Sequence, residues 1–385
     1  MKKPELRFEE FNDDWEEYKL YEICNYTTSS LTTSSILSQC GYPLYDANSQ
    51  IGKVESFHMS EDYITVIKDG AGVGRIRKLP KNTAFIGTMG ALTSKNGNLN
   101  FLYCLLEKND LSKQYTGSTI PHIYFKDYGE TLVSIPNVEE QKKIGTLFDN
   151  LYNLITIHQR KSDILQSLKK SMLEKMFPKE GETKPEIRFE GFTDDWEKHK
   201  LSDIYGIIRN AFVGTASPYY VDEGHFYLES NNVKDGNINK DSQVFINDEF
   251  YYRQKDKWLH TGDMVMVQSG HVGHSAVIPE SLNNTAAHAL IMFQNQRVKT
   301  NPCFLNAEYQ TNKAKKQIDD ITKGNTIKHI LASDMRNFTV MVPSLSEQNE
   351  IADYFRSIDH LLTLHQHKLE SLKHLKSALL DKMFV

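Results

Sequence analysis

Two segments of this chain occur twice, and this internal repeat constrains the fold more than any other feature of the sequence. Residues 4–20 read PELRFEEFNDDWEEYKL, and residues 185–201 read PEIRFEGFTDDWEKHKL. We call these the leading segments. Residues 135–177 and 342–384 form a second matching pair. The residues between the matching segments differ almost everywhere, so each half is a repeated frame around a variable insert.

The second repeated segment of each half is predicted to be a long helix in a coiled coil. Mainly apolar residues recur there at alternating spacings of four and three residues. The predicted seam is Leu147, Leu151, Leu154, His158, Lys161, Leu165, Leu168 and Met172 in the first helix, and Tyr354, Ile358, Leu361, His365, Lys368, Leu372, Leu375 and Leu379 in the second. In an antiparallel pair, the two His and Lys layers are expected to meet near the centre and fix the register. The alternative is that their tips reach solvent past an imperfect seam.

The inserts are predicted to be mixed domains of short strands and short helices. Residues 62–68 and 264–268 have the β-branched composition of strands, whereas residues 101–107 and 307–318 are predicted to be helices. We therefore expect an α+β protein in which an antiparallel two-helix coiled coil separates two mixed α/β domains related by a pseudo-two-fold axis. The predicted divisions are residues 1–135 for the first domain, 136–178 for the first long helix, 179–184 for a hinge, 185–341 for the second domain and 342–385 for the second long helix.

Composition indicates a globular protein of a reducing compartment. Cys24, Cys40, Cys104 and Cys303 have no paired spacing, so neither a disulfide framework nor a structural zinc site is expected. The first ten residues are charged, and no apolar run approaches the roughly 18 residues needed to span a bilayer. We expect a cytoplasmic protein with no membrane partner. The net charge of −5, taken alone, argues against a nucleic-acid partner.

No catalytic or cofactor motif is complete in the sequence. Residues 69–75 (DGAGVGR) have the spacing GxGxG rather than GxGxxG, which favours a tight turn between strands; a loop that offers its backbone to a polyanion is the alternative. Residues 301–304 (NPCF) resemble a loop of adenine amino-methyltransferases, but no S-adenosylmethionine motif precedes them and the first half has no copy. His271, His274 and His288 lack further ligands at a recognisable spacing, so we interpret them as polar loop residues rather than a metal site.

From Pro4 to Phe384 the chain closely resembles the specificity subunit of bacterial Type I restriction-modification enzymes. The resemblance rests on the leading segments and on the residues that begin each long helix, namely Pro136, Glu140, Gln141 and Ile144 in the first half and Pro343, Glu347, Gln348 and Ile351 in the second. It implies that each insert is a target recognition domain for one half of a split site in double-stranded DNA. It also implies a subunit without catalytic residues.

The same resemblance implies protein partners. Two methyltransferase subunits would be held by the helices and leading segments, and up to two restriction subunits could join them. This chain would bind no cofactor, because S-adenosylmethionine, ATP and Mg²⁺ would be used by the partners. A helical seam of about 28 residues is roughly 42 Å long, so the half-sites are expected to lie about one turn of DNA apart or slightly more.

Candidate DNA-reading residues lie in three loops of each insert. Arg and Lys suit guanine, and Asn and Gln suit adenine. The candidates are Asn48, Gln50, Lys53, Arg75, Arg77, Thr119 and His122 in the first insert, and Asn231, Asn232, Lys234, Gln268, Ser269, His271, His274, Asn325, Thr326 and Lys328 in the second. For each of them the alternative is a solvated or turn-forming residue. Lys313, Lys315 and Lys316 are expected to contact phosphate or to solvate a helix.

Neither insert is basic overall. Residues 21–131 contain 10 Lys and Arg against 10 Asp and Glu, and residues 202–338 contain 14 against 15. Because phosphate attraction supplies much of protein–DNA affinity, we expect local basic stripes on the inserts and an additional electrostatic contribution from partner subunits. A second class of function stays open, namely a scaffold whose helices join other proteins and whose inserts bind something other than DNA.

Overall fold

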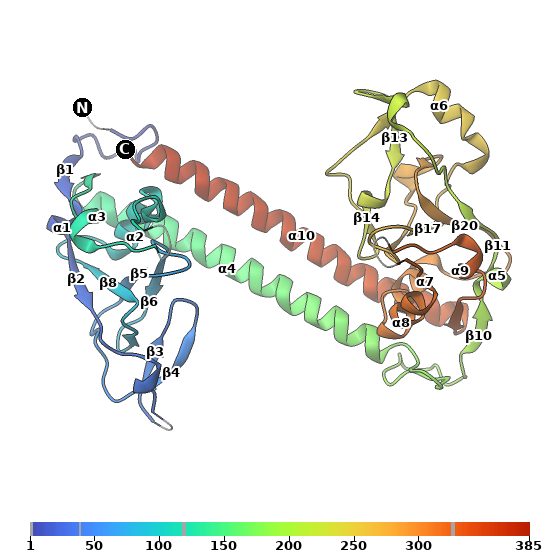
Figure 1. The fold of residues 1–385 in the computed structure, drawn as a ribbon, viewed down its shortest axis with the longest axis horizontal. Helices are drawn as coiled ribbons and strands as arrows, with labels where there is room; N and C mark the ends of the chain where they lie inside the picture. The colour runs from blue at the N-terminus through green and yellow to red at the C-terminus, as the bar shows by residue number, and fades with distance from the viewer. Residues whose placement is uncertain (1–2, 38–39, 118–120, 325–327) are drawn as a thin grey trace. The chain divides into compact units, whose positions relative to one another are not determined.

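In the computed structural model, which describes residues 3–37, 40–117, 121–324 and 328–385, the chain forms two compact units (Figure 1). The first unit comprises residues 1–160 and 366–385, and the second comprises residues 161–365. Each unit contains one leading segment, one insert, the first half of one long helix and the last half of the other. The boundary between the units therefore falls near the middle of each long helix. By contrast, each long helix was predicted to be a segment of its own.

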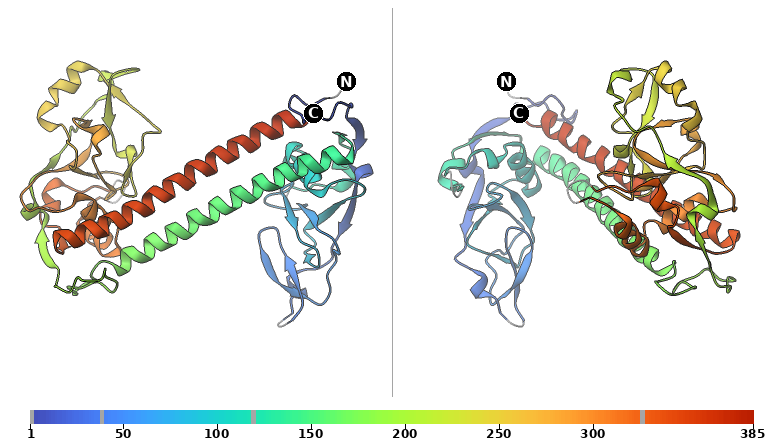
Figure 2. Two further views of the ribbon diagram at one scale, coloured as in Figure 1. Left: turned by 180° about the vertical axis from the view of Figure 1, so that it is seen from behind. Right: turned by 45° about the vertical axis from the view of Figure 1, so that its right-hand side comes forward.

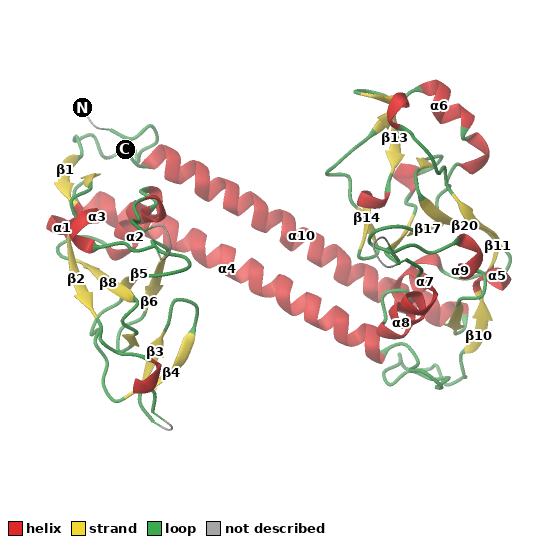
Figure 3. Ribbon diagram, viewed as in Figure 1, coloured by secondary structure: helices red, strands yellow, loops and turns green. Residues whose placement is uncertain are grey.

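A four-stranded antiparallel sheet forms the centre of each insert (Figure 3). In the first insert the order is β2 (Cys24–Thr28), β8 (Met89–Ser94), β5 (Tyr63–Ile67), β6 (Ile76–Leu79). In the second it is β11 (Tyr205–Asn210), β20 (Leu290–Gln296), β17 (Met264–Val267), β18 (Ser275–Val277). The strands predicted around residues 62–68 and 264–268 are confirmed as β5 and β17.

Smaller sheets complete each unit. The first insert adds β3 (Tyr42–Tyr45), which pairs antiparallel with β4 (Gln50–Val54) and parallel with β7 (Ala84–Phe85). The second adds β13 (His225–Leu228), which pairs with β16 (Phe245–Ile246) and with β19 (Ala286–Ala287). Strand β12 (Tyr220–Val221) pairs with the other edge of β16. A separate hairpin consists of β14 (Val233–Lys234) and β15 (Asn237–Ile238). The leading segments form β1 (Glu16–Lys19) on β9 (Leu132–Ile135) and β10 (Glu197–Lys200) on β21 (Thr339–Val342).

Short helices pack around these sheets. They are α1 (Leu20–Ile23), α2 (Leu99–Lys108) and α3 (Phe125–Tyr128) in the first unit, and α5 (Leu201–Ile204), α6 (Asp248–Arg253), α7 (Pro302–Glu308), α8 (Asn312–Ile321) and α9 (Ala332–Met335) in the second. The single helix predicted over residues 307–318 is wrong in its bounds. Thr311 accepts a hydrogen bond from the backbone N–H of Ala314 and caps α8, so the segment divides into α7 and α8.

The residues 301–304 that resembled a methyltransferase loop begin helix α7. The Asn301 side chain accepts hydrogen bonds from the backbone N–H groups of Cys303 and Phe304, and Pro302 occupies the first helical position. The first half does have a counterpart, because Asn98 caps α2 by accepting from the N–H of Phe101. The motif is therefore a helix start within the repeated frame, and the first half keeps the capping Asn without the proline that follows it.

A cluster of four aromatic rings closes the core of each unit. In the first unit, Trp15 and Phe101 have ring centroids 6.0 Å apart, and Phe384 lies 5.3 Å from Phe101 and 5.9 Å from Phe148. These rings come from the leading segment, the insert, the end of one long helix and the start of the other.

The second unit repeats this cluster with Trp196, Phe304, Phe177 and Phe355. Phe177 lies 5.3 Å from Phe304 and 6.1 Å from Phe355. Each unit is thus completed by the end of the helix that began in the other half of the sequence.

Buried ion pairs attach the leading segments to the helix starts. Arg7 donates two hydrogen bonds of 2.7 Å to the carboxylate of Glu140, and Arg188 donates bonds of 2.7 and 2.8 Å to Glu347. Both carboxylates are fully buried. The hydrogen bond to Glu140 raises the pKa of the Arg7 guanidinium. Bidentate pairs of this kind fix orientation as well as proximity.

The glutamine after each buried glutamate links three elements. Gln141 donates to the carbonyl of Pro136 at 2.9 Å and accepts from the N–H of Asn98 at 3.2 Å. Gln348 makes the same bonds to Pro343 and Asn301, at 2.8 and 2.9 Å. The sequence motif that carried the family resemblance is therefore the joint that positions each insert on its long helix.

The long helices α4 (Val138–Lys175) and α10 (Leu345–Met383) run antiparallel in each unit. In the first unit, Phe148 contacts Phe384 while the ammonium of Lys376 lies 5.2 Å from the ring of Tyr152, so the chain directions are opposite. The two helix halves of each unit lie side by side in the views of Figures 1 and 2. The predicted α+β class, with two mixed domains and antiparallel paired helices, is confirmed.

Six of the sixteen predicted seam positions are displaced by one residue. Eight seam positions are buried or half-buried as expected, namely Leu151, His158, Leu165, Met172, Ile358, His365, Leu372 and Leu379. Six other positions are exposed, namely Leu154, Lys161, Leu168, Leu361, Lys368 and Leu375. In each case the next residue is buried or half-buried instead, namely Ile155, Ser162, Lys169, Leu362, Leu369 and Lys376. Leu147 and Tyr354 are half-buried against the cores of their own units. The meeting of the His layers stays a prediction.

The displacement from Leu168 to Lys169 has a physical cause. Lys169 is buried and pairs with Asp359 at 2.6 Å, so a charged residue occupies a seam position that an apolar pattern assigns to Leu168. Its carbon stem packs in the seam while its ammonium reaches the carboxylate. Exposed Leu154, Leu168, Leu361 and Leu375 then form a second apolar stripe beside the seam of each helix.

The seam register can be tested with two leucines three residues apart. Leu372 is 6% exposed and Leu375 is 49% exposed. We expect Leu372→Ala to lower the apparent free energy of unfolding by about 2–3 kcal/mol, because a buried Leu is truncated. Leu375→Ala should change it by less than about 0.5 kcal/mol. Urea denaturation measures both, and an equal loss in the two variants would contradict this register.

The buried ion pair predicts a second effect on stability. Glu347→Gln leaves the Arg188 guanidinium buried without its counter-charge, which should lower the free energy of unfolding by about 3–5 kcal/mol. Replacing both partners by Met should cost less than Glu347→Gln alone. Asp353→Asn is the control, because its pair with Arg356 is largely exposed and should contribute little. Urea denaturation of the full chain measures these free energies. Equal losses in Glu347→Gln and Asp353→Asn would contradict the prediction.

Candidate nucleic-acid interface

Three candidate reading residues of the first insert meet at one turn. Asn48 lies in the turn between β3 and β4, where the Arg75 guanidinium donates to the carbonyl of Ala47 at 2.6 Å and to Asn48 Oδ1 at 2.8 Å. Arg77, on β6, donates to the carbonyl of Asn48 at 3.1 Å. The structure therefore brings Asn48 beside Arg75 and Arg77, which follow it in the sequence by 27 and 29 residues. Gln50 and Lys53 are exposed on the adjacent strand β4.

The glycines of residues 69–75 form a tight turn between β5 and β6, as predicted. Gly70, Gly72 and Gly74 have φ angles of 84°, 86° and 80°, which side-chain-bearing residues rarely adopt. A Cβ atom at Gly74 would lie 2.4 Å from the backbone N of Ser112. Glycine is thus required both by conformation and by space, and the turn does not resemble a phosphate loop at a helix start.

A hairpin in which Thr116 and His122 exchange backbone hydrogen bonds packs beside this turn. The N–H of Gly70 donates to the carbonyl of Pro121 at 3.1 Å, and the His122 ring lies 2.6 Å from a carboxylate oxygen of Asp69. His122 therefore belongs to the same surface as Arg75 and Asn48. Thr119, also predicted to contact DNA, lies outside the described residues.

The second unit repeats this arrangement with different side chains. The N–H of Gly270 donates to the carbonyl of Lys328 at 3.1 Å, and Gly270 and Gly273 have positive φ angles of 79° and 89°. Ser269 is half-buried in the turn, while His271 and Lys328 are exposed. Asn325 and Thr326 lie outside the described residues.

His274 joins this turn to the loop after β14. Its Nδ1 accepts a hydrogen bond from the backbone N–H of Asp235 at 3.2 Å. Burial lowers the pKa of His274, although the Asp235 carboxylate opposes this effect. The neighbouring candidates Asn231 and Lys234 are exposed.

Asn232 is not available to DNA. It is 3% exposed, its amide donates to the carbonyls of Asn239 and Ser242, and its oxygen accepts from the N–H of Glu229. Its prediction as a reading residue is therefore wrong, because the amide holds its own loop together. The neighbouring polar residue Gln268 is half-buried, and its Oε1 has no hydrogen-bond partner among the described residues.

Most Lys and Arg side chains of the first insert have no carboxylate partner among the described residues. Among the described residues, only Lys78, Lys108 and Lys113 of the ten Lys and Arg in residues 21–131 pair with carboxylates. Those without such a partner include Lys53, Lys68, Arg75, Arg77 and Lys126. The first insert is neutral overall, and the local basic stripe stays a prediction. In the second insert, Lys313 donates a hydrogen bond to the carbonyl of Pro178, and Lys316 forms an ion pair with Glu180. Lys315 lies near His274.

A hollow of about 420 Å³ adjoins the glycine turn and was not predicted from the sequence. Its lining is Tyr26, Thr28, Lys68, Asp69, Tyr124, Phe125 and Lys126. Lys68 directly precedes the glycine motif and Lys126 follows His122 by four residues, so extending both motifs outward would have found the two lysines.

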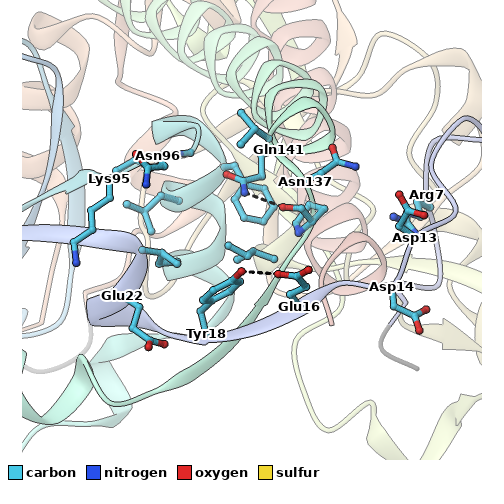
Figure 4. Close-up of a pocket in the computed structure, with 18 residues that line it drawn as sticks. Arg7, Asp13, Asp14, Glu16, Tyr18, Glu22, Lys95, Asn96, Asn137 and Gln141 are labelled. Atoms are coloured by element: carbon cyan, nitrogen blue, oxygen red, sulfur yellow. Dashed lines mark hydrogen bonds between the residues drawn. The ribbon is translucent and has the colours of Figure 1, made fainter.

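A larger groove of about 670 Å³ lies between the first leading segment and the start of α4 (Figure 4). Acidic side chains predominate among its charged residues, with Asp13, Asp14, Glu16 and Glu22 opposed by Arg7 and Lys95. The leading segment of the second half retains Asp194, Asp195 and Glu197 at the positions of the first three acids. Asp13 and Asp194 are both exposed, so packing does not require their charge.

The described residues offer neither a metal centre nor a membrane-spanning helix. No three side chains among His, Cys, Asp and Glu are arranged to hold a metal ion in the described part of the chain. The rings of His271 and His274 lie 6.3 Å apart, and His288 bonds to the carbonyl of Gly214. Of the helices in the described ranges, none is long and apolar enough to cross a membrane.

Comparison with known proteins gives a family. The family model for the Type I restriction modification DNA specificity domain matches residues 12–167 and 193–374, one match for each half of the repeat. The chain belongs to this family. Its members recognise DNA sequence within restriction-modification complexes, and the two matches coincide with the two repeated frames.

Specificity subunits are also among the individual proteins most similar to the chain. The Type I restriction enzyme MjaVIII specificity subunit of Methanocaldococcus jannaschii is 24% identical over 84% of this chain and 78% of its own length. The structure of a specificity subunit from M. genitalium covers 100% of this chain and 99% of its own, with 16% identity and a TM-score of 0.68. A chain from a structural study of Type I complex assembly covers 96% and 97%, with 15% identity and a TM-score of 0.50.

Proposed function

We propose that this chain selects the DNA site of a Type I restriction-modification complex, and that each insert reads one half of a split, asymmetric site. The observation that carries the proposal is that the two units place the same turn and hairpin at the same point of a repeated frame. The bond from Gly70 to Pro121 and that from Gly270 to Lys328 are both 3.1 Å, yet the side chains around them differ. A shared frame with different reading surfaces suits two different half-sites.

The exposed chemistry of each reading surface suits base edges. Arg75 and Arg77 offer forked donors of the kind that bind guanine, and Asn48 offers the amide that suits adenine. In the free protein their hydrogen bonds are directed to the β3–β4 turn. These internal bonds hold the side chains together at the surface, so a base edge would meet an organised group.

The frame supplies two surfaces for partner proteins. The first is the exposed apolar stripe of each long helix, in which Leu154 and Leu168 of α4 match Leu361 and Leu375 of α10 in the repeat. The second is formed by the acids of each leading segment, which line the groove in the first unit and are retained in the sequence of the second. Because both surfaces occur twice, we infer two copies of the same partner, the methyltransferase subunit, with restriction subunits joining that assembly.

Catalysis and cofactors belong to those partners in this proposal. S-adenosylmethionine, ATP and Mg²⁺ would act on the methyltransferase and restriction subunits, while this chain chooses the sequence. The near-neutral inserts imply that the partners also contribute phosphate contacts. The affinity of the isolated chain for DNA should accordingly be much lower than that of the complex.

Sequencing of methylated adenines in cells tests the reading function. Cells with the gene should carry methylation at one asymmetric motif made of two short half-sites and an unread spacer, and deletion of the gene should abolish it. Arg75→Gln should relax or change one half-site only, because the other insert is untouched; Lys81→Gln, in the same insert but away from the turn, should leave the motif intact. A methylome unaffected by the deletion would favour the scaffold alternative.

The helix stripe predicts the stoichiometry of the complex. Leu168→Glu and Leu375→Glu place a charge on equivalent exposed apolar positions, so each should reduce the number of methyltransferase subunits bound per chain from two towards one. The double variant should bind none. Native mass spectrometry of complexes purified through this chain measures the number bound. Gln166→Glu adds the same charge at an exposed polar position of α4, and full occupancy in all four variants would exclude the stripe as the contact surface.

A further inference from the structure

The hollow beside the glycine turn contains two lysines with no counter-charge. Lys68 directly follows β5 and is half-buried. Lys126 lies in α3, and its ammonium is 5.5 Å from the centroid of the Tyr124 ring. Among the described residues neither forms an ion pair. Two cations at one partly enclosed site create a positive potential that low-dielectric walls strengthen. Such a site favours an anion.

The one carboxylate in the hollow is already paired. An oxygen of Asp69 lies 2.6 Å from Nδ1 of His122, in the reading hairpin. The Asp69 carboxylate therefore has a partner other than the two lysines, and the pair ties the hollow to His122. An anion bound by Lys68, the residue next to Asp69, would lie immediately beside the residues expected to meet base edges.

The walls of the hollow are aromatic. Tyr26 stacks on Phe125 with ring centroids 4.4 Å apart and an interplanar angle of 9°. Tyr124 is 49% exposed and its ring stacks 6.3 Å from that of His122. Rigid apolar walls beside two cations suit an anion that carries an organic group, such as the phosphodiester of DNA with its flanking deoxyribose.

The second unit shows that the frame does not require this chemistry. The N–H of Ile123 donates to the carbonyl of Lys68 at 2.9 Å, and the N–H of Ile330 donates to the carbonyl of Gln268 at the same distance. Gln268 therefore takes the place of Lys68. By the same alignment of α3 with α9, Leu331 and Ser333 take the places of Tyr124 and Lys126. The aromatic and cationic hollow is a property of the first insert.

We propose that this hollow binds one backbone phosphate of DNA at the half-site read by the first insert, with Lys68 and Lys126 as its cationic contacts. This inference rests on the proposed function and adds to it a contact that sets position rather than sequence. Phosphate contacts fix the register of a protein on the duplex, and base contacts then read the sequence. The bound phosphate would place the reading surface of Arg75 and His122 over its base pairs.

The salt dependence of DNA binding tests the proposal. Complexes purified through the full chain would be titrated with a short duplex that carries the methylated motif and with a scrambled duplex, at several salt concentrations. Lys68→Gln or Lys126→Gln should reduce the slope of log affinity against log salt by up to about 0.9, the value for one phosphate contact. Both variants should weaken binding to the two duplexes by the same factor and leave the methylated motif unchanged.

Matched variants separate this contact from general effects of charge and folding. Lys68→Arg and Lys126→Arg keep the charge and should retain the wild-type slope. Lys81→Gln removes an exposed lysine at the opposite end of the β5–β6 hairpin and should also retain it. Thermal unfolding of each variant checks the fold, and if a Gln variant unfolds early, the test is decided by the other Gln variant.

The outcomes distinguish the two proposals. Sequence-selective binding by the wild-type complex with unchanged slopes in both Gln variants would overturn the phosphate contact and leave the reading function intact. A change of the methylated motif in these variants would show that the lysines read bases, which also overturns it. Absence of DNA binding by the wild-type complex would overturn the proposed function and, with it, this inference.

Discussion

The buried bidentate pair between an arginine of the leading segment and the first glutamate of a long helix is the constraint on which the rest of the structure depends. Arg7 with Glu140 and Arg188 with Glu347 hold the chain before each insert against the chain after it. The adjacent glutamines Gln141 and Gln348 then bind the N-cap residues of α2 and α7 at the same point. Each insert therefore leaves and rejoins the frame at a fixed joint, which allows its loops to vary.

This separation of frame and loops explains which parts of the structure the sequence could predict. The repeat, the strands β5 and β17 and the antiparallel helices follow from local periodicity and from two copies of each signal. The seam register did not follow, because Lys169 is buried through an ion pair with Asp359 and a second apolar stripe lies next to the seam. A hydropathy pattern cannot distinguish an apolar residue that faces the paired helix from an exposed one beside it.

The reading surface was predictable in part. Asn48, Arg75 and Arg77 were chosen for their chemistry, and the fold places them in contact. Asn232 was chosen for the same reason, but its amide satisfies backbone groups that only the folded loop creates. Lys68 and Lys126 were not among the predicted residues, because the hollow that they line is formed by segments distant in the sequence. Residue type indicates what a side chain can bind, whereas the fold decides whether it is free to bind.

The exchange of helix ends between the two units has a consequence for synthesis on the ribosome. The first unit requires Phe384 beside Trp15 and Phe101, yet Phe384 follows the entire second unit in the chain. The second unit requires Phe177, which is made before its own leading segment. The second unit can therefore close its core first, and the insert that emerges earliest must wait with an open aromatic site. The order of completion during translation is the reverse of the order of the domains.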